Sequence, residues 1–337
     1  MKIIGSYPKS RLRRLRKSSW IRNLVSENNI TANDLVLPIF IREGKGKIEK
    51  IKSMPGVNRY TVDKLPSILK QVKKYKIPMV ALFPYTSVKK KNKLGSEALN
   101  HNNLICKSLR LIKKKFPKIG VMCDVALDPY TSHGHDGVII NKKIDNDETI
   151  KILIKQALLQ AKFGCDVIAP SDMMDGRIGE IRKALDKNNF KDVSILSYAV
   201  KFASNFYGPF RDAVGSKTKL KTDKKTYQMD YRNSFEIYRE VGFDINEGAD
   251  MVMVKPGMIY LDIISKIKNH FKIPVLAYQV SGEYSLIKNA INKKILNKEA
   301  ILESIKSFKR AGACAIITYF AIEIAKNKKT NWNNFPK

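Results

Sequence analysis

Two lysines stand at the ends of apolar runs, where a charged side chain is unexpected. Lys255 follows the run Met251 to Val254 and precedes a Pro-Gly break, and Lys201 closes the run SILSYAVK. Desolvation and repulsion between two ammonium groups both lower the pKa of a buried lysine. The expected result is a neutral, nucleophilic amine, which is the group that carbonyl chemistry through a Schiff base requires.

Further polar side chains follow other apolar runs. They are Asp124, Asp128, Ser171, Asp172, Ser281 and Tyr319. If the runs are strands of one sheet, these side chains should converge on one pocket with the lysines. A serine or aspartate at a strand end is also a common helix cap, and each lysine could simply pair with an aspartate. The candidates for such pairing are Asp124, Asp128, Asp136 and Asp172.

The apolar runs number eight and alternate with amphipathic helical patterns. They begin at residues 35, 79, 120, 167, 194, 251, 275 and 315. Continuous apolar strands separated by helices are typical of parallel sheets, and the count favours a closed (β/α)8 TIM barrel. An open doubly wound sheet would normally carry a glycine-rich phosphate turn after its first strand, and LVLPIFIREGKGK does not supply one. The barrel interpretation places the polar strand ends at the catalytic mouth.

The clearest helical pattern is an apolar stripe that runs from Ile150 to Ala161 and closes at Gly164. Other helices are expected after Tyr260 and after Asn297. Residues 1–30 precede the first strand and are predicted to form an N-terminal arm for subunit contacts. Residues 31–337 are predicted to form the catalytic barrel.

Composition bears on where the protein works. No apolar run approaches the length of a membrane span, and the basic N-terminus is not followed by the apolar region of a secretory signal. We therefore expect a cytoplasmic protein without a membrane partner. Four cysteines without CxxC spacing predict reduced, buried thiols rather than disulfides or a zinc ribbon.

The formal net charge of +32 also suggests a nucleic-acid binder. The lysines are, however, spread over nearly every expected helix and loop, as mutational pressure toward A+T-rich codons would produce on solvated faces. The dense basic run from Arg11 to Lys17 could equally belong to an arm that packs on a partner subunit. We therefore expect no nucleic-acid partner and keep this function as a remote alternative.

Several long motifs resemble the porphobilinogen synthase family, also called 5-aminolevulinate dehydratases. They are SYPKSRLRRLRKS, DVALDPYTSHGHDG, PSDMMDGRIGEIR, KFASNFYGPFRDA, TYQMDYRNS, MVKPGMIYLDII, YQVSGEY and RAGACAIITYFA. The resemblance runs from residue 6 to the last predicted strand. It implies a lyase of tetrapyrrole and heme biosynthesis that condenses two molecules of 5-aminolevulinate to porphobilinogen with loss of two waters.

The resemblance assigns one Schiff base to each lysine. Lys255 would bind the substrate that becomes the propionate-bearing half of the product, and Lys201 the one that becomes the acetate-bearing half. Each iminium makes its ketone an electron sink, and two substrates on one wall gain proximity. A different Schiff-base barrel, of the class I aldolase or dehydroquinase kind, is the alternative enzyme; it would need one essential lysine.

The resemblance also implies the substrate-binding residues. Arg211 and Lys224 match the clamp for the first substrate carboxylate, and Ser281 and Tyr319 match the anchors for the second. Lysine at 224, where many relatives carry arginine, keeps the charge but lacks the two-pronged fork. The other predicted lining residues are Tyr207, Phe210, Gln228, Asp124, Ser171, Asp128 and Asp136. The segment from about 205 to 228 reads as a lid that excludes water.

The metal predictions rest on the same family. Zinc-using members carry cysteines where this chain has Ala126, Asp128 and Asp136, so no catalytic zinc is expected. Asp128 and Asp136 could hold a hard cation transiently or bind the substrate amine directly. His133 and His135 are interpreted as polar loop residues.

The aspartate-rich branch of the family implies a regulatory Mg²⁺ site away from the catalysis. Its marker is a glutamate about fifteen residues before the Schiff-base lysine, which Glu240 fits, and Asp244 lies one turn later on the same helical face. Asp244 would act through the waters of the ion. The family also implies a homo-octamer whose N-terminal arms embrace neighbouring barrels.

Overall fold

The computed structural model describes residues 4–215 and 223–327 of the chain. Eight parallel strands close into a barrel, because β12 at one end of the strand order also pairs with β1. The strands are β1 Leu35–Arg42, β4 Met79–Tyr85, β5 Gly120–Val125, β8 Val167–Pro170, β9 Ser194–Lys201, β10 Met251–Lys255, β11 Val275–Tyr278 and β12 Ala315–Ile317. The predicted barrel and all eight predicted strands are confirmed.

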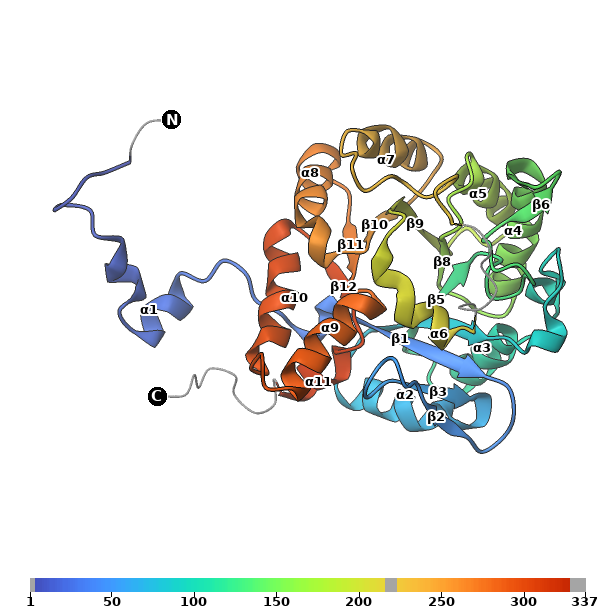
Figure 1. Ribbon diagram of the computed structural model, residues 1–337, viewed down its shortest axis with the longest axis horizontal. Helices are drawn as coiled ribbons and strands as arrows, with labels where there is room; N and C mark the ends of the chain where they lie inside the picture. The colour runs from blue at the N-terminus through green and yellow to red at the C-terminus, as the bar shows by residue number, and fades with distance from the viewer. Residues whose placement is uncertain (1–3, 216–222, 328–337) are drawn as a thin grey trace.

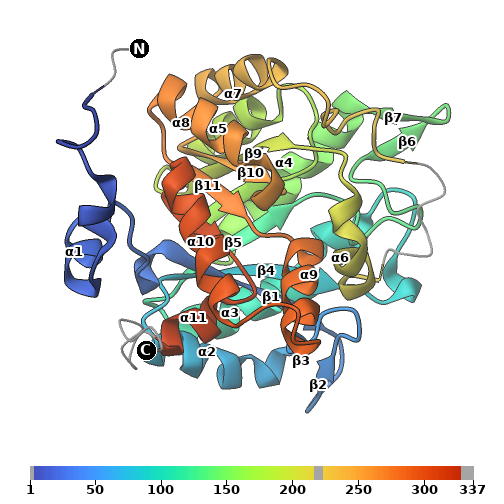
Figure 2. The same cartoon turned by 60° about the vertical axis from the view of Figure 1, so that its left-hand side comes forward.

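Helices surround the barrel (Figures 1 and 2). The longer ones are α2 Leu65–Lys74, α3 Leu104–Lys115, α4 Asn146–Lys162, α5 Arg177–Lys187, α7 Glu236–Asn246, α8 Leu261–Phe271, α9 Ser281–Asn292 and α10 Glu299–Ala311. The short helix α6 Gly208–Ala213 follows β9, and α11 Ala321–Asn327 follows β12. The predicted stripe lies on α4, and Gly164 follows that helix in the left-handed region with φ +93°.

Two strand pairs stand apart from the barrel alternation. The antiparallel strands β2 Ile48–Lys50 and β3 Asn58–Thr61 follow β1, and β3 also pairs in parallel with the C-terminal end of β1. The hairpin of β6 Val138–Ile140 and β7 Lys143–Asp145 follows β5. Both insertions follow the C-terminal ends of barrel strands, where an active site is expected.

The N-terminal segment leads away from the barrel in Figure 1 and contains α1 Ser19–Leu24. None of the residues of α1 is buried. The role of residues 1–30 as a subunit arm stays a prediction, as does the boundary at residue 31. Residues 1–3 of this arm, 216–222 of the predicted lid and 328–337 of the predicted barrel lie outside the described ranges.

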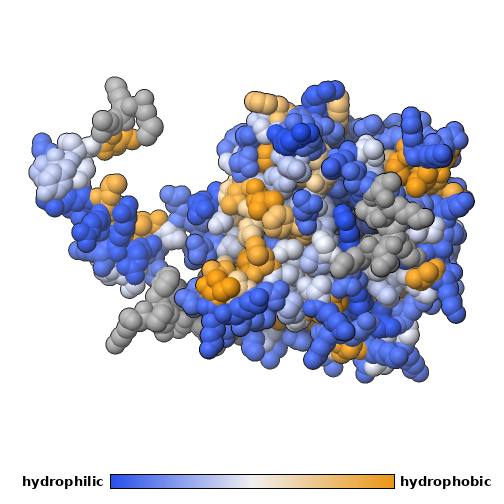
Figure 3. Space-filling view, viewed as in Figure 1, coloured by the Kyte–Doolittle hydropathy of each residue, from blue (hydrophilic) through white to orange (hydrophobic). Residues whose placement is uncertain are grey.

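The surface carries a mixture of polar and apolar residues (Figure 3). Apolar side chains gather on the side of α8 to α10, where Ile259, Leu286, Ile295 and Leu296 are exposed. Among the described residues, none of the helices has both the length and the apolar character that a membrane span requires. All four cysteines are free thiols, and the prediction that all are buried is wrong for Cys314, which is exposed.

Candidate active site

The two lysines lie side by side on neighbouring barrel strands. Lys255 at the end of β10 is in register with Lys201 at the end of β9. Registered residues of parallel strands point to the same face, and the strands lie about 4.8 Å apart. Both side chains are buried, with 6% and 5% of their surface exposed. The predicted convergence of these lysines is therefore confirmed.

Aromatic rings surround the amine of Lys255. Its Nζ lies 5.0 Å from the ring centroids of Tyr198 and Tyr278, 5.1 Å from that of Phe210 and 5.5 Å from that of Tyr207. Burial, and then the charge of Lys201, lower the pKa of Lys255 from its ordinary value to about 7. Within the described part of the chain, Lys255 forms no ion pair.

Lys201 has a different environment. Its Nζ lies 3.1 Å from Oδ1 of Asp136 and also donates to the backbone carbonyl of Ser171. Oδ2 of the same aspartate accepts from Lys224 at 2.6 Å and from the Tyr227 hydroxyl at 2.8 Å. The simple pairing that the sequence left open is thus realised at Lys201, with Asp136 as the partner.

The aspartates near the lysines differ in their electrostatics. Burial alone would raise the pKa of Asp136, but Lys201 and Lys224 outweigh it, so the pKa lies well below its ordinary value. Burial raises the pKa of Asp124 to about 6, although Lys255 opposes the shift. Asp128 lies 3.6 Å from Lys224 Nζ and shares that cation with Asp136. The carboxylate that balances Lys201 is therefore charged, and Asp124 can exchange a proton near neutral pH.

Helix α6 brings predicted substrate-binding residues over the mouth. Phe210 lies on α6 with its ring beside Lys255, and its backbone N–H donates to Ser281 Oγ at 2.8 Å. Arg211 follows on the same helix. The Tyr207 hydroxyl donates to the backbone carbonyl of Lys255 at 3.1 Å and so ties this residue to the end of β10.

The remaining predicted lining residues lie around this mouth. Tyr319 follows β12, and its hydroxyl lies 3.0 Å from that of Tyr278, which is a neighbour of Lys255. Gln228 is buried on the segment after residue 223. That segment is fastened to the barrel because the next residue, Met229, donates its N–H to the Lys201 carbonyl at 3.0 Å.

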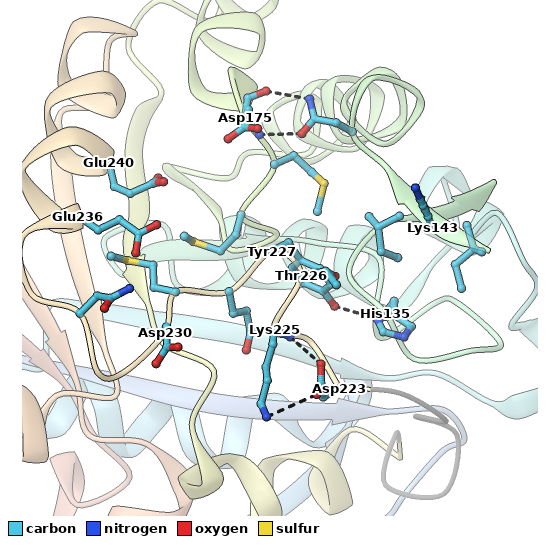
Figure 4. A pocket seen from close by; sticks show the side chains of 18 of the residues that line it. His135, Lys143, Asp175, Asp223, Lys225, Thr226, Tyr227, Asp230, Glu236 and Glu240 are labelled. Atoms are coloured by element: carbon cyan, nitrogen blue, oxygen red, sulfur yellow. Dashed lines mark hydrogen bonds and ion pairs between the residues drawn. The ribbon is translucent and has the colours of Figure 1, made fainter. Parts of the chain in front are cut away.

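The predicted regulatory residues lie on α7, away from the lysines. Glu240 lines a cavity of about 800 Å³ (Figure 4), where it lies with Glu236 on one wall, opposite His135 and Lys143. Burial raises the pKa of Glu240, although Arg177 opposes the shift. Asp244 instead points inward and pairs with Arg177 at 3.2 Å.

The donor atoms near Glu240 are suited to a hard cation that keeps most of its waters. A second hollow beside α7 is lined by the acidic residues Asp175, Glu236, Glu240, Asp244 and Glu247 and by Arg177 and Arg239. The Asp244 carboxylate is already bonded to Arg177 and Ser197. Mg²⁺ is commonly held by one or two carboxylates and several waters. Across residues 4–215 and 223–327, no three His, Cys, Asp or Glu side chains form a ready-made metal cage. His133 Nε2 lies 3.2 Å from the Lys93 carbonyl, to which it donates a hydrogen bond.

Comparison with known proteins identifies the relatives. The family model for delta-aminolevulinic acid dehydratase matches residues 9–327. The chain belongs to the delta-aminolevulinic acid dehydratase family. It is 54% identical to the delta-aminolevulinic acid dehydratase of Bradyrhizobium diazoefficiens over 95% of this chain and 91% of the relative. It is 50% identical to that of Methanothermus sociabilis over 95% of this chain and 99% of the relative.

A solved structure of the delta-aminolevulinic acid dehydratase family has the same fold. The Toxoplasma gondii ME49 enzyme, also named porphobilinogen synthase, was crystallised in complex with the reaction product porphobilinogen. It superposes with a TM-score of 0.94 at 44% identity, covering 97% of this chain and 95% of that chain. The family resemblance read from the motifs is confirmed, and it takes precedence over the aldolase alternative.

Three residues of the site were not singled out from the sequence. Tyr198 and Tyr278 lie inside apolar strands, where an aromatic residue reads as ordinary core. Tyr227 stands in the motif TYQMDYRNS, but nothing in its spacing indicated a bond to Asp136. Their only sequence signal is that they fall within or next to family motifs.

Proposed function

We propose that this chain condenses two molecules of 5-aminolevulinate to porphobilinogen, with one Schiff base on Lys255 and one on Lys201. The observation that carries the proposal is the register of the two buried lysines at the mouth of a barrel of this family. A lyase of porphyrin biosynthesis requires both substrates on one wall, and neighbouring strand ends supply that arrangement.

Lys255 is the amine that is ready to react. Because its pKa is about 7, Lys255 is uncharged in a large share of the protein molecules at neutral pH and then carries a free lone pair. The amine attacks the substrate ketone, the resulting carbinolamine loses water, and an iminium remains. The surrounding rings exclude water from this nitrogen, and their faces favour the positive charge of the iminium.

Lys201 must first give up its bond to Asp136. The substrate amine can take the place of the lysine ammonium beside that carboxylate, because both are ammonium groups of similar size. Asp136 and Asp128 already hold the ammonium of Lys224. This favours substrate amine binding over a transient metal at the two aspartates, since a cation would have to displace the lysines.

The substrate carboxylates are proposed to meet cationic and hydroxyl groups. Arg211 and Lys224 clamp one, and Ser281 and Tyr319 hold the other. Lys224 can turn from the aspartates to a substrate carboxylate once a substrate ammonium neutralises them. Tyr207, Phe210, Gln228, Asp124 and Ser171 complete the proposed walls.

The proposed regulatory site would hold Mg²⁺ at Glu240. Asp244 would act through water, for which it would have to release Arg177 and Ser197. A bound cation there would neutralise part of the carboxylate cluster on α7. Turnover compared in EDTA, Zn²⁺ and Mg²⁺ tests this proposal, together with Mg²⁺ binding measured by calorimetry on Glu240→Gln. Stimulation by Mg²⁺ that Glu240→Gln removes is the expected result, and dependence on Zn²⁺ would contradict it.

Assembly and location are proposed as well. The N-terminal segment exposes apolar side chains, which suits packing on other subunits in a homo-octamer. They include Tyr7, Leu12, Leu15, Trp20 and Leu24. Four free thiols suit the reducing cytoplasm. Light scattering of the purified protein gives the assembly size, and a monomer at working concentration would contradict the octamer.

The main experiment is a turnover assay with 5-aminolevulinate as sole substrate. Wild-type protein should release porphobilinogen, and Lys255→Met should not. The matched control is Lys187→Met, an exposed lysine on α5, which should keep full activity. Full activity of Lys255→Met, or no product from wild-type protein, would overturn the proposal.

A further inference from the structure

The C-terminal end of helix α6 is held by an arginine from a distant part of the chain. Nε of Arg59 donates to the carbonyl of Ala213 at 2.7 Å, and Nη2 donates to the carbonyl of Asp212 at 2.7 Å. The last carbonyls of a helix have no partners within the helix, and a cation is favourable there. Arg59 satisfies two such carbonyls although its side chain is buried.

Two further contacts fasten the same end of α6. The Ser53 hydroxyl donates to the Asp212 carboxylate at 2.5 Å. Gly215, with φ +68°, passes so close to the ring of Tyr85 that a Cβ would lie 2.6 Å from it. A residue with a side chain would not fit there, so Gly215 packs directly on Tyr85 just after the end of α6.

Arg59 is itself held rigidly. Its Nη1 lies 2.8 Å from Oε1 of Glu49, and its guanidinium stacks over the Tyr85 ring at 4.5 Å. It stands on β3 opposite Phe40 of β1. The insertion that contains β2 and β3 thus presents a fixed, two-pronged donor to α6, which a lysine could not reproduce.

We propose that Arg59 is a positioning residue that docks α6 over the mouth of the barrel and thereby sets substrate affinity. The inference rests on the proposed function, in which α6 supplies Arg211 to a substrate carboxylate and Phe210 to the wall beside Lys255. Ser281 holds the other half of α6 through the Phe210 N–H, so both ends of the helix are fixed. The connection after β1 therefore serves substrate binding although it contributes no side chain to the lysines.

Steady-state kinetics of Arg59→Met tests this role. The methionine keeps an apolar stem over Tyr85 and removes the guanidinium, and with it the donors to α6, the ion pair with Glu49 and the cation over the Tyr85 ring. We expect KM for 5-aminolevulinate to rise on the order of tenfold, with kcat changed much less, because a displaced α6 weakens binding of the substrate carboxylate. Lys50→Met on exposed β2 is the matched control and should leave KM unchanged.

Two variants separate docking from general stability. A merely stabilising role would lower Tm and the yield of active enzyme but leave KM at the wild-type value, and that result would overturn the proposal. Arg59→Lys should have a KM between those of Arg59→Met and wild-type protein, since one ammonium can reach one of the two carbonyls. If Arg59→Met does not fold, Ser53→Ala should still raise KM about twofold to threefold, and an unchanged KM in that folded variant would contradict docking. Wild-type protein without turnover would instead refute the proposed function.

Discussion

The ends of β9 and β10 carry the same side chain in register, yet their surroundings are opposite. Lys255 is enclosed by four aromatic rings and has a pKa of about 7. Lys201 lies in a polar network with Asp136, Lys224 and Tyr227. In the proposed mechanism, apolar burial prepares Lys255 for attack, whereas the ion pair with Asp136 holds Lys201 until a substrate rearranges the network.

This difference gives the two amines an order. In the proposed mechanism Lys255 forms its iminium when a ketone enters, whereas Lys201 must first exchange its bond to Asp136. On this proposal the two lysines would treat identical substrates differently because their environments differ. The first Schiff base is expected on Lys255.

The largest expected effect is the loss of turnover when either lysine is replaced. Trapping of a single substrate distinguishes the two replacements. Both Lys255→Met and Lys201→Met should lose turnover by on the order of 10⁴-fold or more, as removal of a nucleophile does. Lys201→Met should still trap one substrate on Lys255 under borohydride, as intact mass spectrometry would show. Trapping that disappears in Lys201→Met would mean that the two sites do not act independently.

Stability should respond to the same two substitutions with opposite signs. The folded pKa of Lys255 lies below its ordinary value of 10.5, so the unfolded chain binds the proton more tightly. Stability therefore rises with pH between about 7 and 10.5, and the cost of burying Lys255 is largest below that window. Lys255→Met should stabilise by on the order of 3 kcal/mol near pH 7.

Lys201→Met should instead destabilise, because it removes one of the cations that balance buried Asp136. Urea unfolding at pH 6 and at pH 9 measures both variants against Lys187→Met. A gain in Lys255→Met that grows toward pH 9 would have the wrong sign and would refute the assigned pKa.

A smaller effect is expected from Tyr227→Phe. The change removes the hydroxyl that donates to Asp136 at 2.8 Å and leaves the ring in place. A hydrogen bond to a charged group contributes about 1.5–3 kcal/mol, and Lys224 still partners the same oxygen, so we expect kcat/KM to fall about fivefold to tenfold. Tyr231→Phe, at an exposed position, is the control. Equal kcat/KM values for the two variants would mean that the hydrogen bond from Tyr227 to Asp136 does not contribute to catalysis.

The barrel could be predicted because its strands are nearly continuous apolar runs and its helices carry clear stripes. The register of Lys255 with Lys201 follows from that same pattern, since both residues end their runs. The partner of Lys201 could not be chosen among four aspartates, because the choice depends on how two irregular segments fold over the mouth. Asp172, one of those candidates, lies instead beside Arg177 at 3.7 Å.

The aromatic rings around Lys255 could not be predicted from the sequence for a different reason. Tyr198 and Tyr278 face the barrel interior from two strands, and a single strand does not reveal what lies across the barrel. The hydrogen bond from Arg59 to Ala213 at the end of α6 joins residues 154 positions apart, and no local sequence pattern encodes such a contact. Periodicity predicts strands and faces, whereas contacts between distant loops require the folded chain.

The most direct test of the central claim follows the modification of each lysine with pH. Wild-type protein is mixed with limiting 5-aminolevulinate, quenched rapidly with borohydride between pH 5.5 and 9, and mapped by peptide mass spectrometry. The account predicts that the substrate adduct appears first on Lys255, at a rate that rises with pH and levels off above about 7. An adduct that appears first on Lys201, or a Lys255 rate that keeps rising toward pH 9, would contradict it.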